Sequence, residues 1–499
     1  MFMAPDPGLV RLRTSLRAVL GIGLAVTVCQ AAGLPLPATV TGGLAALLAL
    51  FTVADPTVRG QAVTTVLLPV AGLPVLAVAA ALHGTATARD AAWLAVVFAG
   101  AYARRWGPRG HALGVFAFMM FFAAQFLRAV PQQIPQLYAA VALSLATASA
   151  VRFGVWCVER RTPPPAPPVP LTGRGLARPT TRQACQVTAA CAFAIVAGET
   201  VSHDRWYWAV GAAWWIFVNT ASRGETLVRG LRRLVGTVAG IVAGLLIALP
   251  LHGAPAPTTV LIAASVFGIF YTAALSYSWM MFFVTVMAGL LYGLLGVLRP
   301  GLLGLRLAET GAGALGAALA VALVLPVTTH AVTDQWVRRA VRAVHGCTAA
   351  SARRLAGDAE ADPAARAAEL EALLGRVRPS LAPLVHPLNP LRGRKARARH
   401  VLALLDECAL RARGLAAVAA DPDASHDARL TAACRRVETA VEALLGAVPE
   451  DAFTAHAGAP GRHPGAERAL GHLHGLEQAL VSLAPHLGTP LGGPSPLPA

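Results

Sequence analysis

Long apolar runs separated by short polar turns fill roughly the first two thirds of the chain. A helix that crosses a bilayer needs about 20 mostly apolar residues, and the runs fall into two groups of six. Several runs are short or interrupted by proline, so the sequence predicts ten to twelve spans, with twelve preferred. The predicted spans lie near residues 16–34, 38–54, 61–82, 91–103, 111–128 and 135–153, then 183–200, 206–220, 234–251, 257–275, 279–298 and 306–326.

The pattern changes at two places. Between the two groups stands RRTPPPAPPVPLTGRGLARPTTR, a Pro-rich and basic stretch that predicts an extended linker. From about residue 331, Leu and Val recur at i, i+3, i+4 and i+7 among charged residues, which predicts four or five amphipathic helices of a soluble domain. We therefore expect a first transmembrane repeat (1–159), a cytoplasmic linker (160–182), a second transmembrane repeat (183–330), a cytoplasmic helical domain (331–487) and a disordered tail (488–499).

The two apolar groups resemble each other. LRAVLGIGLAVTVCQAAG at 16–33 parallels RQACQVTAACAFAIVAGE at 182–199, and DPTVRGQAVTTVLLPVAG at 55–72 parallels GETLVRGLRRLVGTVAG at 224–240. Six is an even number, so both copies would have the same orientation. The predicted fold is all-α, a polytopic membrane bundle of two six-span repeats with a cytoplasmic helical domain, and paired repeats are a recurring plan of secondary transporters.

Composition and charge agree with a membrane protein. The chain is 56% hydrophobic and 13% charged, with a mean hydropathy of +0.57 and a net charge of +17. When the spans alternate from a cytoplasmic N-terminus, most arginines of the apolar part fall inside, which predicts that both termini are cytoplasmic in the plasma (inner) membrane. We expect no nucleic-acid partner, because few basic residues fall on an aqueous domain.

An aromatic group opens one predicted span. It comprises Trp206, Tyr207, Trp208 and Trp214. Aromatic rings favour the membrane–water interface, so Trp206, Tyr207 and Trp208 anchor the span or, alternatively, line a path for a planar substrate, whereas Trp214 lies deeper and fits an interface belt less well.

Arginines follow at the next turn. Arg229 and Arg233, with Arg232, have helical spacing on one predicted face, and Arg223 precedes them. They either anchor the helix by positive-inside snorkelling or attract organic anions from the cytoplasm. Gly236, Gly240 and Gly244 then form GxxxGxxxG, a spacing that favours close helix packing.

Acidic residues are rare in the apolar part, and Glu309 is the best candidate for proton coupling. Arg306 precedes it by three residues on the same predicted face. An ionisable group inside a span is costly and often functional. The alternative is that this pair lies at the membrane edge and sets the depth of the helix.

The stretch WYWAVGAAWWIFVNTASRGETLVRGLRRLVGTVAGIVAGLL resembles the fusaric acid resistance protein-like family, membrane transporters that include aromatic acid exporters. RLAETGAGALGAALAVALVLP at 306–326 resembles its last span, although Glu309 stands where Asp is expected. The resemblance covers about residues 11–330 and is strongest at 200–245. It implies export of organic, often aromatic, acids driven by an ion gradient. The residues that carry it are Tyr207-Trp208-Ala209, Glu225-Thr226, Arg229-Gly230, Arg233, Gly236-Thr237 and Gly240.

Other chemistry is not indicated. No phosphate-binding loop, zinc motif or nucleophile elbow occurs, and the seven cysteines form no CxxC pair, so we expect no enzyme, cofactor or metal. The expected partners are the bilayer and a small organic anion, with a homo-oligomer left open. Two alternatives to an exporter remain: a non-transporting scaffold whose cytoplasmic bundle binds a partner, and an anion channel.

Overall fold

The computed structural model describes residues 6, 9–159, 175–220, 222–251, 254–294, 296, 300–326, 329–355, 358, 360–385, 392–419, 428–445 and 464–488. Every regular element among them is helical, which confirms the all-α prediction for this part of the chain. The chain divides into two compact units, one holding residues up to 221 with 226–326, the other residues 222–225 with 327 onward. Most of the predicted linker and all but Gly488 of the predicted tail lie outside the described residues.

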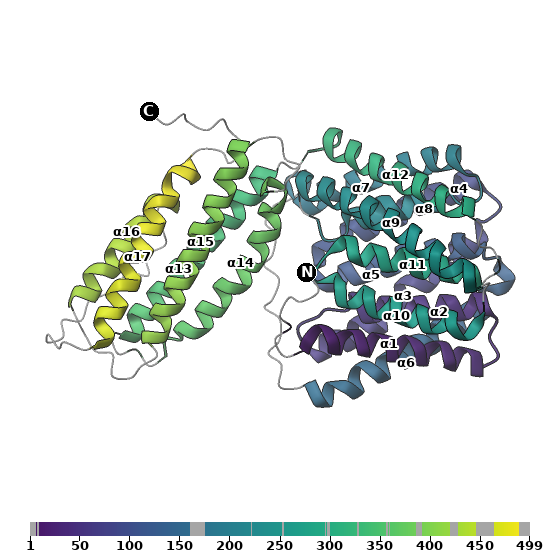
Figure 1. The fold of residues 1–499 in the computed structure, drawn as a ribbon, viewed down its shortest axis with the longest axis horizontal. Coiled ribbons are helices and arrows are strands. Elements are labelled where there is room, and N and C mark those ends of the chain that lie inside the picture. Colours follow the sequence, from purple (N-terminus) through teal and green to yellow (C-terminus); the bar gives the residue numbers. More distant parts are fainter. Residues whose placement is uncertain are drawn as a thin grey trace. The chain divides into compact units, whose positions relative to one another are not determined.

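The first unit is a bundle of membrane-type helices lying side by side (Figure 1). Each predicted span overlaps one of its twelve described helices. They are α1 (Val10–Ala31), α2 (Leu36–Thr52), α3 (Val58–Ala81), α4 (Ala86–Ala103), α5 (Gly107–Leu127), α6 (Ile134–Glu159), α7 (Pro179–Val201), α8 (Tyr207–Phe217), α9 (Arg223–Leu251), α10 (Pro255–Ala273), α11 (Tyr277–Leu294) and α12 (Pro300–Leu323).

Length and composition support fewer spans than helices. Nine segments of the described chain are long and apolar enough to cross a membrane, and one of them, Ala86–Leu127, contains both α4 and α5. The helix α2 has 17 residues, at the lower limit for a span, and α8 has 11, which is too few to cross a bilayer. The candidate spans among the described residues make the chain a multi-pass membrane protein.

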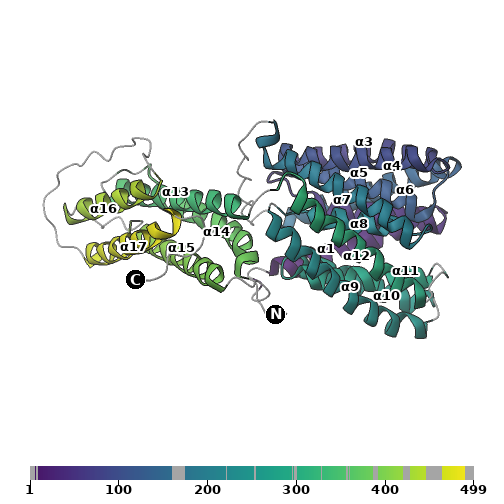
Figure 2. The same ribbon diagram turned by 90° about the horizontal axis from the view of Figure 1, so that it is seen from above.

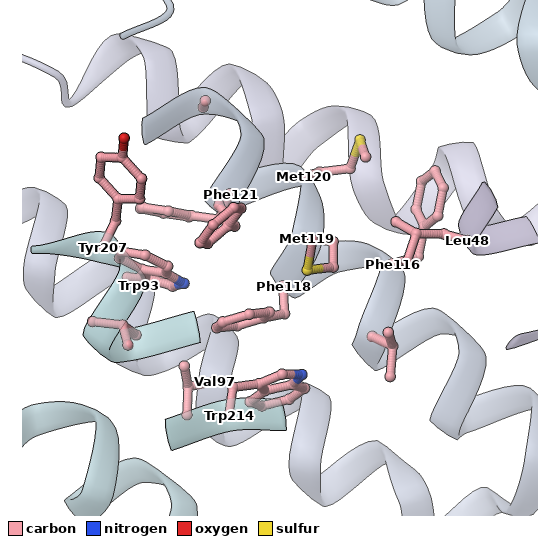
Figure 3. Packing of buried hydrophobic residues seen from close by; sticks show 14 of the residues in the cluster. Leu48, Trp93, Val97, Phe116, Phe118, Met119, Met120, Phe121, Tyr207 and Trp214 are labelled. Atoms are coloured by element: carbon pink, nitrogen blue, oxygen red, sulfur yellow. The ribbon is translucent and has the colours of Figure 1, made fainter. Parts of the chain in front are cut away.

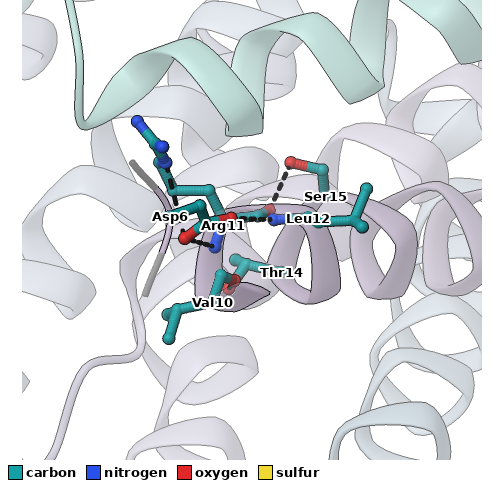
Figure 4. Close-up of polar contacts among 6 residues, drawn as sticks. All are labelled: Asp6, Val10, Arg11, Leu12, Thr14 and Ser15. Atoms are coloured by element: carbon teal, nitrogen blue, oxygen red, sulfur yellow. Dashed lines mark hydrogen bonds and ion pairs between the residues drawn. The ribbon is translucent and has the colours of Figure 1, made fainter. Parts of the chain in front are cut away.

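Local sequence explains where many helices begin. Proline, which lacks an N–H and has a fixed φ, stands in the first turn of α2, α7 and α10. At the start of α1 an acidic side chain satisfies the free backbone donors: the Asp6 carboxylate accepts hydrogen bonds from the backbone N–H groups of Arg11 and Leu12, both at 3.2 Å (Figure 4). Hydroxyls within α1 donate to the preceding turn, as Ser15 does to Arg11 O at 2.8 Å, so they lie in an apolar helix without an unmet donor.

The helices of the two groups have corresponding neighbours. In the first group, α1 packs against α2 and α6, and α2 packs against α6. In the second group, α7 packs against α8 and α12, and α8 packs against α12. The groups meet through α4 with α7 and through α1 with α10, which are also corresponding pairs.

Aromatic rings fill the core where the two groups meet. Phe118 on α5 stacks on Trp214 of α8 with centroids 4.4 Å apart, and Phe121 stacks on Trp93 of α4 at 5.1 Å (Figure 3). Most of α5 from Val115 to Gln125 is buried. Because α5 is apolar on all sides and buried on most of them, it packs tightly and holds α8 in a fixed position.

The second unit contains α13 (Thr329–Leu355), α14 (Pro363–Val385), α15 (Arg392–Ala419), α16 (Ala428–Leu445) and α17 (Pro464–Gly488). The described residues thus form five helices where the sequence predicted four or five. They run alongside one another in both views (Figures 1 and 2). Asp362 begins α14 by accepting the Ala365 N–H at 3.0 Å, the N-cap that its Asp-Pro sequence predicts.

Candidate functional site

The helix α8 is about half as long as its neighbours. Eleven residues span about 16 Å, whereas the 23 residues of α7 span about 35 Å. It ends at Val218, whose backbone is extended, and at Asn219, whose φ of 60° is left-handed. Discontinuous helices of this kind place backbone dipoles and side chains inside a membrane bundle, where transporters build substrate sites. The candidate site lies at the two ends of α8.

The aromatic residues at its start are inside the protein. Trp206, Tyr207 and Trp214 are each only 4% exposed. Trp206 packs edge-on against Trp93 at 5.3 Å and lies under the Arg89 guanidinium at 4.3 Å. A membrane-interface belt needs rings on the lipid-facing surface, so the anchoring interpretation does not describe these three residues.

Trp208 belongs to a polar cluster that links α8, α11 and α12. Its indole Nε1–H donates to the Tyr292 hydroxyl at 2.7 Å. The Arg306 guanidinium lies 3.8 Å from the centre of the Trp208 ring, a cation–π contact. Arg306 is 4% exposed, and its Nη1 has no hydrogen-bond partner among the described residues. The cluster therefore holds a buried positive charge with an unused donor.

Glu309 is the tenth residue of α12 and lies one turn from Arg306. It is 1% exposed, and neither carboxyl oxygen has a hydrogen-bond partner in the described chain. The pair does not form an ion pair, because Arg306 lies over Trp208 instead. Arg306 and Arg205 are the positive charges that act electrostatically on the Glu309 carboxyl. This burial places Glu309 within the bundle rather than at an exposed edge.

The other end of α8 is capped by side chains from three helices. The carbonyl of Trp215 accepts the Arg229 Nε–H and the Tyr277 hydroxyl, both at 3.3 Å. Arg104 donates to the Phe217 carbonyl at 3.1 Å. The last carbonyls of a helix have no partner within it and carry partial negative charge, so cations stabilise them. Arg229 thus has a structural role, and its guanidinium also lies 3.8 Å from the centre of the Tyr277 ring.

Arg233 differs from its neighbours on α9. It is 5% exposed and donates from Nη1 to the Tyr277 hydroxyl at 3.2 Å, while its Nε has no hydrogen-bond partner in the described chain. Its charge also acts repulsively on Arg306. Arg232, the preceding residue, is exposed. The sequence placed Arg229, Arg232 and Arg233 on one face, but the structure gives them three different environments.

Glycines bring α9 close to α11. A Cβ at Gly240 would lie 2.7 Å from Thr285 Cβ and 2.8 Å from Phe282 O, and one at Gly236 would collide with Ser278 and Met281. Gly244 has more room, with Val286 Cα at 3.7 Å. This close packing positions Arg233 against α11. Arg223, the first residue of α9, is exposed, so it does not join the buried cluster.

A comparison with known protein families gives a match for part of the chain. Residues 191–320 match the fusaric acid resistance protein-like family, which supports the resemblance of the aromatic–arginine stretch. This segment is similar to the fusaric acid resistance protein-like proteins. It runs from within α7 to within α12 and so includes α8 and its polar neighbours. No curated protein and no solved structure matches the chain.

The sequence analysis did not select Tyr277, Tyr292 or Arg104, which all form hydrogen bonds with α8. Tyr277 and Tyr292 stand near opposite ends of α11, where they contact Arg233 and Trp208 respectively. The chain has only six tyrosines, so two in one apolar helix were a usable signal. Arg104 had no such signal, because its contact with Phe217 joins residues more than one hundred positions apart.

Proposed function

We propose that the chain is a secondary transporter of small organic anions and that the anion binds at Arg233 and Arg306. The observation that carries this proposal is the pair of buried guanidiniums, each with an N–H donor that has no partner in the described chain. A buried unsatisfied donor costs about 1–3 kcal/mol, and more for a charged group. A bound anion that accepts hydrogen bonds from these groups would offset this cost.

Electrostatics favours an anionic ligand. The two arginine charges repel each other, and neither forms an ion pair with a carboxylate of the described chain. An anion held near these charges would relieve the repulsion and accept a hydrogen bond from a free donor. Trp208 and Tyr292 beside Arg306 would give such a ligand an aromatic surface. Membership of residues 191–320 in a transporter family supports the same class, and the resemblance makes export of aromatic acids the expected direction and substrate.

Glu309 is the proposed proton-binding group. Its carboxyl is buried, has no hydrogen-bond partner in the described chain and interacts electrostatically with Arg306. An anion bound at Arg306 would therefore alter the relative stability of the protonated and ionised forms of this carboxyl. Anion occupancy and protonation are therefore linked, and linkage acts in both directions. Proton coupling through this residue follows from that linkage.

Transport in inverted vesicles tests the proposal. Labelled aromatic and aliphatic carboxylic acids are offered under a proton gradient of either direction, with Glu309→Gln, Arg233→Met and the exposed control Arg232→Met. Gradient-dependent uptake that is lost in the first two variants and kept in the control supports the proposal. Uptake that no longer responds to the gradient in Glu309→Gln supports the coupling role. A steady current without proton dependence would indicate an anion channel, and no movement of any acid would favour a scaffold.

We also propose that the two groups of helices are repeats with the same orientation and cytoplasmic starts. The shared packing of α1, α2 and α6 with that of α7, α8 and α12 supports this, together with the similar sequences. Gly33 follows α1 and His203 follows α7, and both are exposed. In a cysteine-free background, Gly33→Cys and His203→Cys should react with an impermeant thiol reagent from outside the cell. Labelling from opposite sides would contradict the repeat.

A further inference from the structure

The second unit separates positive from negative charge along its length. The helix α15 begins Arg-Gly-Arg-Lys-Ala-Arg-Ala-Arg at 392–399, in which five of eight residues are basic and none is acidic. Residues 358–371 instead hold five acidic residues and one basic residue. Elsewhere in the bundle opposite charges pair across helices, as Arg429 does with Glu467 at 2.8 Å and Arg436 with Glu477 at 3.0 Å.

Helix directions place these two segments at opposite ends. Arg378 of α14 pairs with Asp406 of α15 at 2.8 Å, and Glu371 pairs with Arg413 at 2.9 Å. Residue numbers fall along α14 as they rise along α15, so the two helices are antiparallel. The start of α15 therefore lies beside the end of α14, about 35 Å of helix from the acidic segment at its start.

The start of α13 lies at the same end as the start of α15. A short connection from α13 to α14 makes these helices an antiparallel pair, so α13 runs parallel to α15. The Cys347 thiol lies 3.7 Å from the Ala412 carbonyl, which sets the register between α13 and α15. Thr329 and Arg394 each precede those residues by 18 positions, about 27 Å of helix.

Chain connectivity ties this end to the membrane. The helix α12 ends at Leu323 and α13 begins at Thr329, so the connection reaches at most about 20 Å. Trp336, near the start of α13, packs under the Arg339 guanidinium at 5.2 Å. Tryptophan and arginine together are typical of the membrane–water interface.

We propose that this end of the second unit binds the anionic phospholipid headgroups of the membrane that α12 crosses. We call it the basic end, and it comprises Arg338, Arg342, Lys395 and Arg399. Arg342 and Arg399 are exposed and form no ion pair with described residues. On α16, Glu438 interacts electrostatically with His345 in the middle of α13, and Glu442 follows it one turn later. Each basic residue near an anionic surface strengthens attraction about fivefold.

Hydrogen exchange of the full-length chain in lipid nanodiscs tests the proposal. Exchange of residues 392–400 is compared in pure phosphatidylcholine and in phosphatidylcholine mixed with phosphatidylglycerol. We expect exchange to slow severalfold in the anionic lipid and to recover in high salt, which screens the attraction. Residues 363–371, at the acidic end, should exchange equally in both lipids. Equal exchange of residues 392–400 in the two lipids would overturn the proposal.

Variants locate the effect. Lys395→Ala with Arg399→Ala should lower the apparent affinity for phosphatidylglycerol about 25-fold, whereas Arg353→Ala with Arg366→Ala should leave it unchanged. Unchanged exchange at 363–371 reports that the variants are folded, and if they are not, the lipid comparison on the natural chain decides. Protection of 392–400 by an added DNA oligonucleotide, but not by phosphatidylglycerol, would assign the surface to nucleic acid and overturn the proposal.

Discussion

Three arginines within five residues of α9 should behave in three different ways when each is replaced by methionine. Arg229→Met removes a charged hydrogen bond to Trp215 O, about 1.5–3 kcal/mol, and a cation–π contact at 3.8 Å, about 0.5–2 kcal/mol. We expect a loss of about 2–5 kcal/mol in the free energy of unfolding. Arg232→Met changes an exposed residue and should alter stability by less than about 0.5 kcal/mol.

Arg233→Met should separate function from stability. The variant loses a charged hydrogen bond to Tyr277, about 1.5–3 kcal/mol, and a weaker contact with Met281 Sδ at 3.4 Å, but it also removes a buried charge that is costly to desolvate and that repels Arg306. These effects oppose each other, so stability should change by less than about 1 kcal/mol. The anion loses a charged partner worth about 1.5–3 kcal/mol, which raises the KM for transport about 10- to 100-fold.

Thermal unfolding in detergent and transport in vesicles measure the two quantities on the same preparations. Arg229→Met should unfold at a lower temperature, Arg232→Met should match the natural chain in both assays, and Arg233→Met should fail only in transport. If Arg233→Met is as unstable as Arg229→Met, or transports normally, the assignment of Arg233 to the anion site is wrong.

Further predictions follow from packing, hydrogen bonding and titration. Gly236→Ala should destabilise the bundle by about 1–3 kcal/mol in thermal unfolding because its Cβ would meet α11, whereas Gly304→Ala, with nothing within 4 Å, should not. Trp208→Phe keeps a ring but leaves Tyr292 without its 2.7 Å donor, which should cost about 1 kcal/mol in the same assay. Burial raises the pKa of the Cys408 thiol to about 12, with Glu407 adding to the shift. The unfolded thiol ionises near pH 8.5, so this group lowers the stability of the second unit by about 1.4 kcal/mol per pH unit above that value, and urea unfolding of Cys408→Ala should show a smaller loss.

Sequence patterns predicted the helices well because an apolar solvent leaves few choices. Backbone groups in a bilayer must bond within their own helix, so each apolar run becomes a helix whatever surrounds it. Every predicted span overlaps one helix, from α1 to α12. The lengths of the helices were predicted less well, since α8 has only 11 residues and the chain turns at Asn219 within an otherwise apolar stretch.

The candidate site could be predicted only in part. Arg306, Glu309 and Trp208 could be selected from the sequence, because charged and aromatic residues stand out in apolar helices. It could not distinguish Arg229 from Arg233, because the difference depends on which carbonyls and hydroxyls of α8 and α11 lie within reach. Helical spacing predicts the direction of a side chain on its own helix, but not the neighbours that it meets.

The contrast between two buried arginines supports placing the proposed anion site in the second group. Arg152 on α6 donates to Val53 O at 2.9 Å and to Ala49 O at 2.6 Å, so its charge caps the end of α2. Arg306 on α12, the corresponding helix, contacts an aromatic ring and keeps a free donor. A buried cation that caps a helix stabilises the fold, whereas one that leaves a donor unmet destabilises it. Of these two arginines in corresponding helices, Arg306 is therefore the one whose cost a bound anion would offset.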